Sequence, residues 1–177
     1  MCFRKKVFAY AKSIYDIETS FYLQQGIKYL LIDLDNTLDS YRLCYPTLPA
    51  IDLVNRLKES GITPIIVSNN RGKRVRTYSH FIQVDCINSA MKPFAKKIVG
   101  FLKEKNIKHD KVMLIGDQIM TDVGAANAAH IKVILTDKIV REDQWTTRLN
   151  RLIDKPLRRR LFKKGKLKDW RTFYGKS

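Results

Sequence analysis

The sequence contains little cysteine, little histidine and no long apolar run. Its three cysteines lie far apart and form no Cys-x-x-Cys pair, which excludes a disulfide framework and a cysteine-based zinc site and predicts reduced thiols. The three histidines are equally isolated, so we interpret them as surface or packing residues. No stretch approaches the roughly 20 apolar residues that span a bilayer, and Lys12, Asp16 and Glu18 interrupt any signal-peptide core. These absences predict a cytoplasmic protein.

Negative charge is scarce as well. The chain has 17 Asp and Glu residues against 34 Lys and Arg, which gives a formal net charge of +17. Residues 141–177 carry 13 of the basic residues and only 4 of the acidic ones, so the excess is concentrated near the end of the chain. A basic surface attracts phosphate-bearing partners such as nucleic acid or anionic lipid. A lysine-rich composition can also reflect biased base composition in a genome, so the charge alone leaves the partner open.

The length and composition fit one globular domain. A chain of 177 residues can bury roughly 70% of its unfolded surface. A hydrophobic fraction of 45% is ordinary for a folded protein and excludes wholesale disorder. The sequence contains no internal repeat and no low-complexity linker, so we expect a single domain over residues 1–177.

Short apolar runs alternate with longer amphipathic segments along the middle of the chain. Runs of about five residues, each followed by a helix-length segment, predict βαβ units and a parallel sheet, hence an α/β fold. A further amphipathic helix is expected over about 10–25, lying across the sheet, and a basic helix and tail over about 144–177. The expected strands span residues 29–33, 63–67, 83–87, 111–115 and 131–135. The expected helices that follow them span residues 48–60, 72–80, 93–105, 119–129 and 144–163.

Two acidic residues follow the first expected strand. Asp33 and Asp35 come directly after the apolar run 29–32. Bare charge at the end of a buried strand is costly to desolvate, so such a pair usually accompanies a cation, a proton or a reacting electrophile. On its own, the pair fits ordinary helix or turn caps equally well.

Three more polar motifs follow along the chain. Ser68-Asn69-Asn70 comes after the second expected strand, Lys92-Pro93 lies farther on, and the segment Gly116 to Asp122 follows the fourth strand. Ligands bind at the carboxyl ends of the strands in open α/β sheets. Because the acidic pair and two of these motifs fall at such ends, we expect a functional site at that edge.

The residue types at this edge suit phosphoryl transfer. Two or three carboxylates without histidine or cysteine are a ligand set for Mg²⁺, and a lysine and a hydroxyl group can bind phosphate oxygens. Phosphoryl transfer needs an in-line nucleophile, neutralisation of the equatorial oxygens and a proton for the leaving group. A carboxylate can be that nucleophile by forming an aspartyl-phosphate. The sequence offers a candidate for each part.

In their order, the four motifs resemble those of the haloacid dehalogenase (HAD) superfamily of phosphohydrolases. They are Asp33-Leu34-Asp35-Asn36-Thr37, Ser68-Asn69-Asn70, Lys92 and Gly116-Asp117-x-x-x-Thr121-Asp122. The resemblance implies a Rossmann-like parallel sheet with helices on both faces. The intervals between the first three motifs are too short for a large cap domain, so we expect an open site that admits bulky phosphoesters.

Further segments resemble the subfamily IIIA phosphatases of the YqeG type, which are related to mitochondrial phosphatidylglycerophosphatase. These segments are Ser13-Ile14-Tyr15-Asp16-Ile17, Gly26-Ile27-Lys28, and Arg148-Leu149-Asn150-Arg151 followed by a basic helix. The resemblance covers about residues 7–170, which is nearly the whole chain.

The resemblance implies a role for each charged motif residue. Asp33 would be the nucleophile that attacks phosphorus. Asp35 would protonate the leaving oxygen and later activate the water that hydrolyses the aspartyl-phosphate, while its backbone carbonyl binds Mg²⁺. Asp33 and Asp117 would be side-chain ligands of the ion. Lys92 would neutralise charge on the phosphoryl group, and Asp122 would position Lys92 or a metal-bound water.

Three uncharged positions complete the site that the resemblance implies. The hydroxyl of Ser68 and the backbone N–H of Asn69 would hold phosphate oxygens, and Thr37 would brace the loop beside the substrate. Plainer interpretations remain open at this stage. Thr37 and Ser68 also fit helix or turn caps, Lys92 fits a solvated loop lysine, and Asp122 fits a helix-start carboxylate.

The motifs predict a Mg²⁺-dependent phosphomonoester hydrolase that acts through an aspartyl-phosphate intermediate. Its substrate would be a phosphorylated small molecule or a lipid such as phosphatidylglycerophosphate. The basic amphipathic segment from Leu149 to Phe162 suits peripheral contact with an anionic membrane. Such a helix can equally pack its apolar stripe on the sheet and leave its basic side to solvent.

Two alternatives use the basic surface differently. A protein that binds RNA or a ribonucleoprotein would stack unpaired bases on aromatic residues while Lys and Arg hold the phosphates. The aromatic residues near the basic tail are Trp145, Trp170, Phe173 and Tyr174. A phosphatase acting on nucleic-acid ends would combine both features, since an open site admits such substrates.

Overall fold

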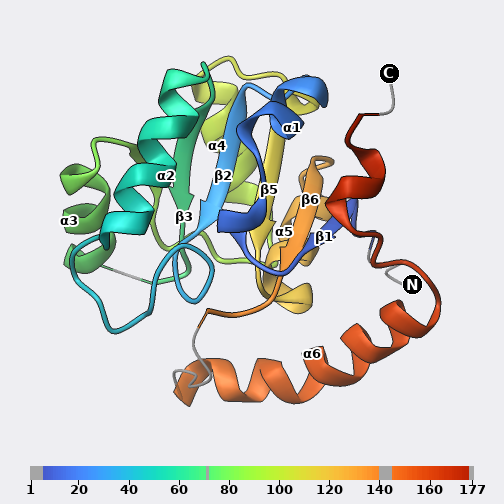
Figure 1. The fold of residues 1–177 in the computed structure, drawn as a ribbon. Coiled ribbons are helices and arrows are strands. Elements are labelled where there is room, and N and C mark those ends of the chain that lie inside the picture. Colours follow the sequence, from blue (N-terminus) through green and yellow to red (C-terminus); the bar gives the residue numbers. More distant parts are fainter. Residues whose placement is uncertain (1–5, 71, 140–144, 176–177) are drawn as a thin grey trace.

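The computed structural model describes residues 6–70, 72–139 and 145–175, with the backbone alone for residues 145–152. Six parallel strands form one sheet in the order β1-β6-β5-β2-β3-β4 (Figure 1). From one edge to the other, the strands are β1 (Ala9–Ala11), β6 (Lys132–Thr136), β5 (Val112–Gly116), β2 (Tyr29–Asp33), β3 (Thr63–Val67) and β4 (Asp85–Ile87).

Helices cover both faces of this sheet (Figure 1). The helices on one face are α1 (Thr19–Gln24), α2 (Leu48–Glu59) and α3 (Lys73–Phe81), and those on the other are α4 (Lys96–Glu104) and α5 (Gly124–Ala128). Successive residues of a strand point to opposite faces. In β2, Leu30 and Ile32 therefore join the core under the first group of helices, while Leu31 joins the core under the second.

The predicted α/β fold is confirmed. All five expected strands are present, each beginning and ending within two residues of its expected bounds. The helix expected over 119–129 begins as the π-helical turn η3 (Ile119–Val123) and continues as α5. Within the described residues, the segments that follow β2 and β3 contain no inserted domain, as expected for a site without a large cap.

The prediction of one helix over residues 10–25 is wrong. This segment instead contains β1, the 3-10 turn η1 (Ile14–Asp16) and the short helix α1. Tyr10 pairs with Leu135 across the β1–β6 ladder, and local periodicity cannot reveal such a long-range pairing. Three of the apolar residues in this segment, Ile14, Ile17 and Phe21, are nevertheless buried, whereas Leu23 is exposed.

The C-terminal part of the chain lies along two edges of the sheet. α6 (Trp145–Lys163) runs along the edge where the strands end, and the chain then returns beside β1 (Figure 1). There the N–H of Tyr10 donates to the carbonyl of Lys168 at 2.8 Å. Leu157 and Leu161 of α6 pack against the core, whereas Phe162 is 74% exposed. None of the described helices is both long and apolar enough to cross a bilayer.

The aromatic residues expected to stack on bases are largely engaged in the fold. Trp170 is buried with its ring centroid 5.4 Å from that of Phe21. Phe173 stacks on Phe8 at 4.9 Å, and Tyr174 donates a hydrogen bond to Glu18 at 2.7 Å. The side chain of Trp145 lies outside the described residues. The described aromatic residues therefore give no support to the base-stacking hypothesis.

Candidate active site

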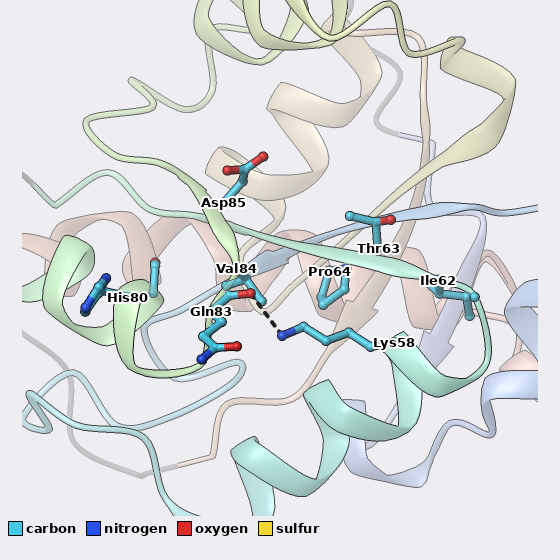
Figure 2. Close-up of a pocket in the computed structure, with 10 residues that line it drawn as sticks. Lys58, Ile62, Thr63, Pro64, His80, Gln83, Val84 and Asp85 are labelled. Atoms are coloured by element: carbon cyan, nitrogen blue, oxygen red, sulfur yellow. Dashed lines mark hydrogen bonds between the residues drawn. The ribbon is translucent and has the colours of Figure 1, made fainter.

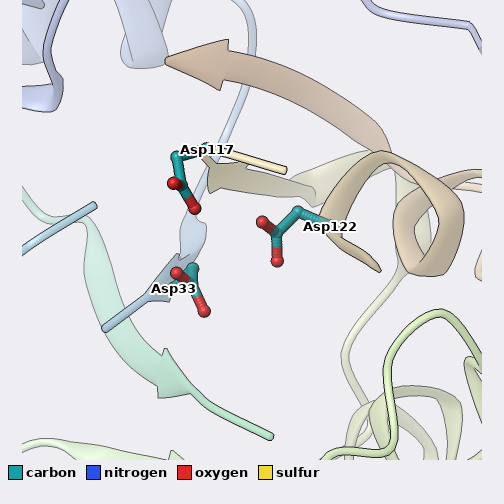
Figure 3. A group of neighbouring side chains, drawn as sticks. All are labelled: Asp33, Asp117 and Asp122. Atoms are coloured by element: carbon teal, nitrogen blue, oxygen red, sulfur yellow. The ribbon is translucent and has the colours of Figure 1, made fainter. Parts of the chain in front are cut away.

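Three carboxylates converge at the edge of the sheet where the strands end (Figure 3). Asp33 is the last residue of β2, Asp117 follows β5, and Asp122 lies in η3. One oxygen atom from each residue lies within 4.8 Å of the others, and all three residues are buried. The parallel sheet thus brings together acids from distant parts of the sequence.

Lys92 supplies a positive charge to this group. Its buried ammonium lies 2.5 Å from Oδ1 of Asp33 and 2.6 Å from Oδ1 of Asp122. Burial alone would lower the pKa of Lys92, but the two carboxylates outweigh it and raise that pKa above its usual value. Burial raises the pKa of Asp33 well above its usual range, and Lys92 lowers it only in part. The neighbouring carboxylates, first Asp122, raise the Asp33 pKa further.

Three buried carboxylates lie close together here, and the ammonium of Lys92 contacts two of them, Asp33 and Asp122. Like charges crowded in a buried position repel one another, and a divalent cation would offset that repulsion. The three side chains offer only carboxylate oxygens, the hard ligands that Mg²⁺ and similar cations take. The cluster therefore fits a hard divalent cation, and its three acids are the candidate ligands.

A glycine makes the close approach of Asp122 feasible. A Cβ atom at Gly116 would lie 2.4 Å from Cγ of Asp122, so no larger residue fits there without displacing the carboxylate. Oδ2 of Asp122 accepts the backbone N–H of Gln118 at 3.0 Å while its Oδ1 contacts Lys92. Asp122 is therefore more than a plain helix-start carboxylate, because it contacts Lys92, as the motif resemblance implied.

The side chain of Asp35 lies in a second network. Its Oδ1 forms an ion pair with the guanidinium of Arg74. Its Oδ2 accepts hydrogen bonds from Asn70 Nδ2 at 2.8 Å and from Ser68 Oγ at 3.2 Å. Arg74 also donates to the carbonyl of Leu43 at 2.7 Å, which ties the loop after β2 to α3. The expected metal contact of the Asp35 carbonyl stays a prediction.

Thr37 and Asn69 form hydrogen bonds with Asp33 and Lys92, respectively. Oγ1 of Thr37 donates to Oδ2 of Asp33 at 3.2 Å. The side-chain amide of Asn69 accepts the N–H of Lys92 at 2.7 Å and donates to its carbonyl at 2.9 Å. Asn69 thus fixes the backbone of Lys92, a contact that differs from the phosphate contact expected of its own N–H group.

Sequence reasoning missed three residues at this edge, namely Arg74, Asp154 and Arg158. Arg74 lies in a basic run, where nothing distinguishes it from its neighbours. Asp154 did carry a signal, because it is a lone acid within a strongly basic helix and stands four residues before Arg158. An i,i+4 pair of this kind lies on one side of a helix.

A separate cavity of about 690 Å³ opens at the opposite edge of the sheet, near the beginnings of β3 and β4 (Figure 2). Lys58 lies in it and donates to the carbonyls of Ile82 and Gln83, each at 2.9 Å. Because the three-acid group lies where the strands end, this cavity is not part of the candidate active site.

Comparisons with known proteins identify the family of the chain. The family described as haloacid dehalogenase-like hydrolase matches residues 10–136. The chain is 31% identical over 156 residues to a probable phosphatase, YqeG, of Bacillus subtilis (strain 168), covering 88% of this chain and 91% of the relative.

Two solved structures share the fold. One, from Vibrio cholerae, carries a provisional assignment as 3-deoxy-D-manno-octulosonate 8-phosphate phosphatase. Its TM-score is 0.52 at 15% identity, over 81% of this chain and 91% of that one. The other is the cobalt-bound deoxy-D-mannose-octulosonate 8-phosphate phosphatase (YrbI) from Haemophilus influenzae. Its TM-score is 0.50 at 13% identity, over 65% of this chain and 81% of that one. At these identities the likeness establishes the fold alone.

Proposed function

Because the chain belongs to the haloacid dehalogenase-like hydrolases, we propose that it hydrolyses phosphomonoesters through an aspartyl-phosphate formed on Asp33. The family assignment is the one that the motifs predicted. The observation that carries the mechanism is the contact of Asp33 with the ammonium of Lys92, next to two further buried carboxylates. The residues proposed as nucleophile, charge-neutralising group and metal ligands thus lie close together.

Asp33 and Lys92 would act on the phosphoryl group together. An oxygen of Asp33 attacks phosphorus, forms the aspartyl-phosphate and displaces the alcohol oxygen of the substrate. The ammonium of Lys92 offsets the negative charge on the phosphoryl oxygens as that bond forms. Thr37, which donates to the other oxygen of Asp33, holds the carboxylate in one orientation. Oδ1 of Asp122 accepts a second hydrogen bond from the ammonium of Lys92 and helps to hold it in place.

Asp35 would transfer the protons of both steps. In its protonated form it donates to the departing alcohol oxygen, and the resulting carboxylate then takes a proton from the attacking water. That water releases phosphate and restores Asp33. Arg74, Asn70 and Ser68 orient the Asp35 carboxyl group, and the Ser68 hydroxyl would turn to a phosphate oxygen when substrate binds.

We propose that the divalent cation is Mg²⁺, held by Asp33 and Asp117 with Asp122 close by. The ion would supply charge neutralisation for the crowded carboxylates and for the phosphate. An all-oxygen set with few protein ligands is typical of Mg²⁺ sites, which keep water and substrate oxygens as further ligands. Substituting Ca²⁺, which prefers more ligands and longer bonds, should support little turnover.

The test of this function is phosphate release from p-nitrophenyl phosphate by the purified protein. We expect turnover with Mg²⁺ that is lost with a chelator. Asp33→Asn should lower kcat by about 10³-fold or more, as loss of a covalent nucleophile does, with little change in fold. Beryllofluoride, a mimic of the acyl phosphate, should stabilise the wild-type protein but not Asp33→Asn. Equal turnover by the two proteins would refute the proposal.

For the substrate, we propose a phosphorylated lipid presented at an anionic membrane surface. α6 runs along the active-site edge (Figure 1) and carries basic residues around a groove of about 460 Å³, among them Lys155, Arg160 and Lys163. An exposed apolar residue accompanies them, since Phe162 also lies on α6. Basic and apolar side chains on one helix favour the interface of an anionic bilayer.

We propose that the protein contacts the cytoplasmic side of the bilayer. The free thiols of Cys44 and Cys86 fit a reducing compartment. Co-flotation should be stronger with vesicles that contain phosphatidylglycerol than with pure phosphatidylcholine. The double change Arg160→Glu with Lys163→Glu should abolish it, whereas Lys103→Glu with Lys108→Glu, an equal change of charge on and beside α4, should not. Binding that ignores lipid charge would contradict the proposal.

A further inference from the structure

α6 contacts the active-site edge through two side chains that stand one helical turn apart. The first is Asp154, which is only 2% exposed. Its two oxygens accept the backbone N–H groups of Ile119 at 2.8 Å and Met120 at 3.0 Å. These are the first residues of η3, the turn that carries Asp122. The first N–H groups of a helix have no partner within the helix, so the carboxylate of Asp154 satisfies them from outside.

The second side chain is Arg158. One guanidinium nitrogen donates to the backbone carbonyls of Asp117 at 2.8 Å and Thr136 at 2.9 Å. The other terminal nitrogen donates to Oδ1 of Asp137 at 2.8 Å. Because the planar guanidinium has several donors in fixed directions, a single side chain ties together the ends of β5 and β6. One of those ends is the backbone of a proposed metal ligand.

We propose that Asp154 and Arg158 are positioning residues for the metal site, so that α6 sets the affinity of the chain for its divalent cation. Arg158 fixes the backbone at Asp117, and Asp154 fixes the start of the turn that presents Asp122. Between them they hold the backbone at Asp117 and at Ile119 and Met120, within the segment that carries two of the three acids. The inference rests on the proposed function, because it takes the cation to bind at this cluster.

These contacts act against a repulsion within the site. The buried carboxylates of Asp33, Asp117 and Asp122 lie close together, and like charges in a buried position repel one another. A segment whose backbone is held at Asp117 and at Ile119 and Met120 keeps the ligand oxygens close together, so binding does not have to order it. Outer contacts of this kind orient metal ligands, and their loss typically weakens metal binding about 10- to 100-fold.

The positive charge of Arg158 works in the opposite direction, because a guanidinium near the site repels a cation. Its charge, however, is paired with the carboxylate of Asp137 at 2.8 Å, which cancels most of its field at the cluster. The geometric contribution of the two carbonyl hydrogen bonds should therefore dominate. Removing Arg158 is expected to weaken cation binding, whereas a purely electrostatic role would strengthen it.

The experiment is direct measurement of Mn²⁺ binding from the electron paramagnetic resonance signal of the free ion, without substrate. We expect Arg158→Met to weaken binding about 10-fold or more, and Asp154→Asn to weaken it to a lesser extent. The matched control is Arg159→Met, since Arg159 is exposed and forms no hydrogen bond or ion pair among the described residues. Its affinity should stay within twofold of the wild type.

A second readout separates positioning from general damage. The Mg²⁺ concentration for half-maximal hydrolysis of p-nitrophenyl phosphate should rise in Arg158→Met by the same factor as the Mn²⁺ dissociation constant. KM for the phosphate ester at saturating Mg²⁺ should stay near the wild-type value. Circular dichroism will show whether Arg158→Met folds. If it does not, Arg158→Lys and Asp154→Asn test the inference in its place, and wild-type Mn²⁺ affinity in both variants overturns it.

Other outcomes separate failure of the positioning role from failure of the proposed metal site. Arg158→Met with wild-type or stronger Mn²⁺ binding overturns the positioning role, while Asp117→Asn that has lost binding leaves the proposed metal site standing. A wild-type protein that binds no Mn²⁺, or Asp117→Asn that binds it normally, removes the metal site and the positioning role together.

Discussion

The edge of the sheet where the strands end carries two charged networks that differ in burial and in their number of carboxylates. In the first, the ammonium of Lys92 contacts Asp33 and Asp122, Asp117 lies beside these two acids, and all four residues are buried. In the second, Asp35 pairs with Arg74, and the two side chains are 17% and 19% exposed. The first brings three carboxylates close together, whereas the second centres on one.

This difference separates two tasks of the same reaction. The first network crowds three buried carboxylates, so a ligand that brings positive charge relieves their repulsion, which suits it to hold a divalent cation and a reactive carboxylate. The second network pairs one carboxylate with one guanidinium and remains in contact with water, which suits a group that must give and accept protons. Breaking an ion pair costs more in a buried site than at an exposed one. Substitutions in the two networks should therefore have unequal effects.

The largest effect is expected for Lys92→Met. The change leaves the carboxylates of Asp33 and Asp122 buried without their ammonium, which should destabilise the metal-free protein by about 3–5 kcal/mol. Hydrolysis should be lost, and Mg²⁺ should restore part of the stability because it replaces the missing positive charge. Thermal denaturation with and without Mg²⁺ measures both. The control is Lys96→Met, since Lys96 is exposed on α4. If Lys92→Met has the same melting temperature as this control, the ammonium of Lys92 does not stabilise the buried carboxylates of the first network.

A smaller effect is expected for Gly116→Ala, which disturbs the first network through packing alone. The new Cβ would meet Cγ of Asp122 at 2.4 Å and force this carboxylate away from Lys92. We expect a loss of about 1–3 kcal/mol in unfolding free energy, as for other overpacked sites, together with weaker Mg²⁺ dependence of hydrolysis.

Gly100→Ala is the matched control, because a Cβ there meets nothing within 4 Å. Gly100 lies within α4, so alanine should leave stability unchanged or raise it by up to about 1 kcal/mol. Chemical denaturation of both variants gives the comparison. If both glycine variants behave alike, the close approach of Asp122 does not limit the first network.

The sequence predicted the first network better than the second. Asp33 directly follows one apolar run, and Asp117 follows another after Gly116, and both runs fit buried strands. The parallel sheet therefore places their backbones at one edge. Lys92 was predicted by its place among ordered motifs rather than by local pattern. The structure brings Asp33, Asp117, Asp122 and Lys92 together, while their catalytic roles remain proposals.

The parts that were not predicted depend on contacts between distant segments. Arg74 meets Asp35 because α3 packs beside the loop after β2, and no local pattern records that approach. The same reason explains the missed roles of Arg158, whose partners lie at the ends of two strands. β1 is only three residues long, and its pairing with β6 outweighed the helical spacing of nearby apolar residues. Periodicity reports the face that a residue buries, not the element that it meets.

The smallest effect is expected for Arg74→Met, which disturbs the second network. Asp35 keeps its hydrogen bonds with Asn70 and Ser68, and water can replace the guanidinium. Stability should therefore fall by no more than about 1 kcal/mol. Turnover should fall about tenfold with phenyl phosphate, whose leaving group needs a proton, and less with p-nitrophenyl phosphate, whose leaving group does not. Arg76→Met, a change of an exposed arginine on the same helix, should leave both rates unaltered. An equal loss with both esters would indicate that Arg74 contributes to phosphate binding instead of orienting the acid, and the division of tasks between the two networks would not hold.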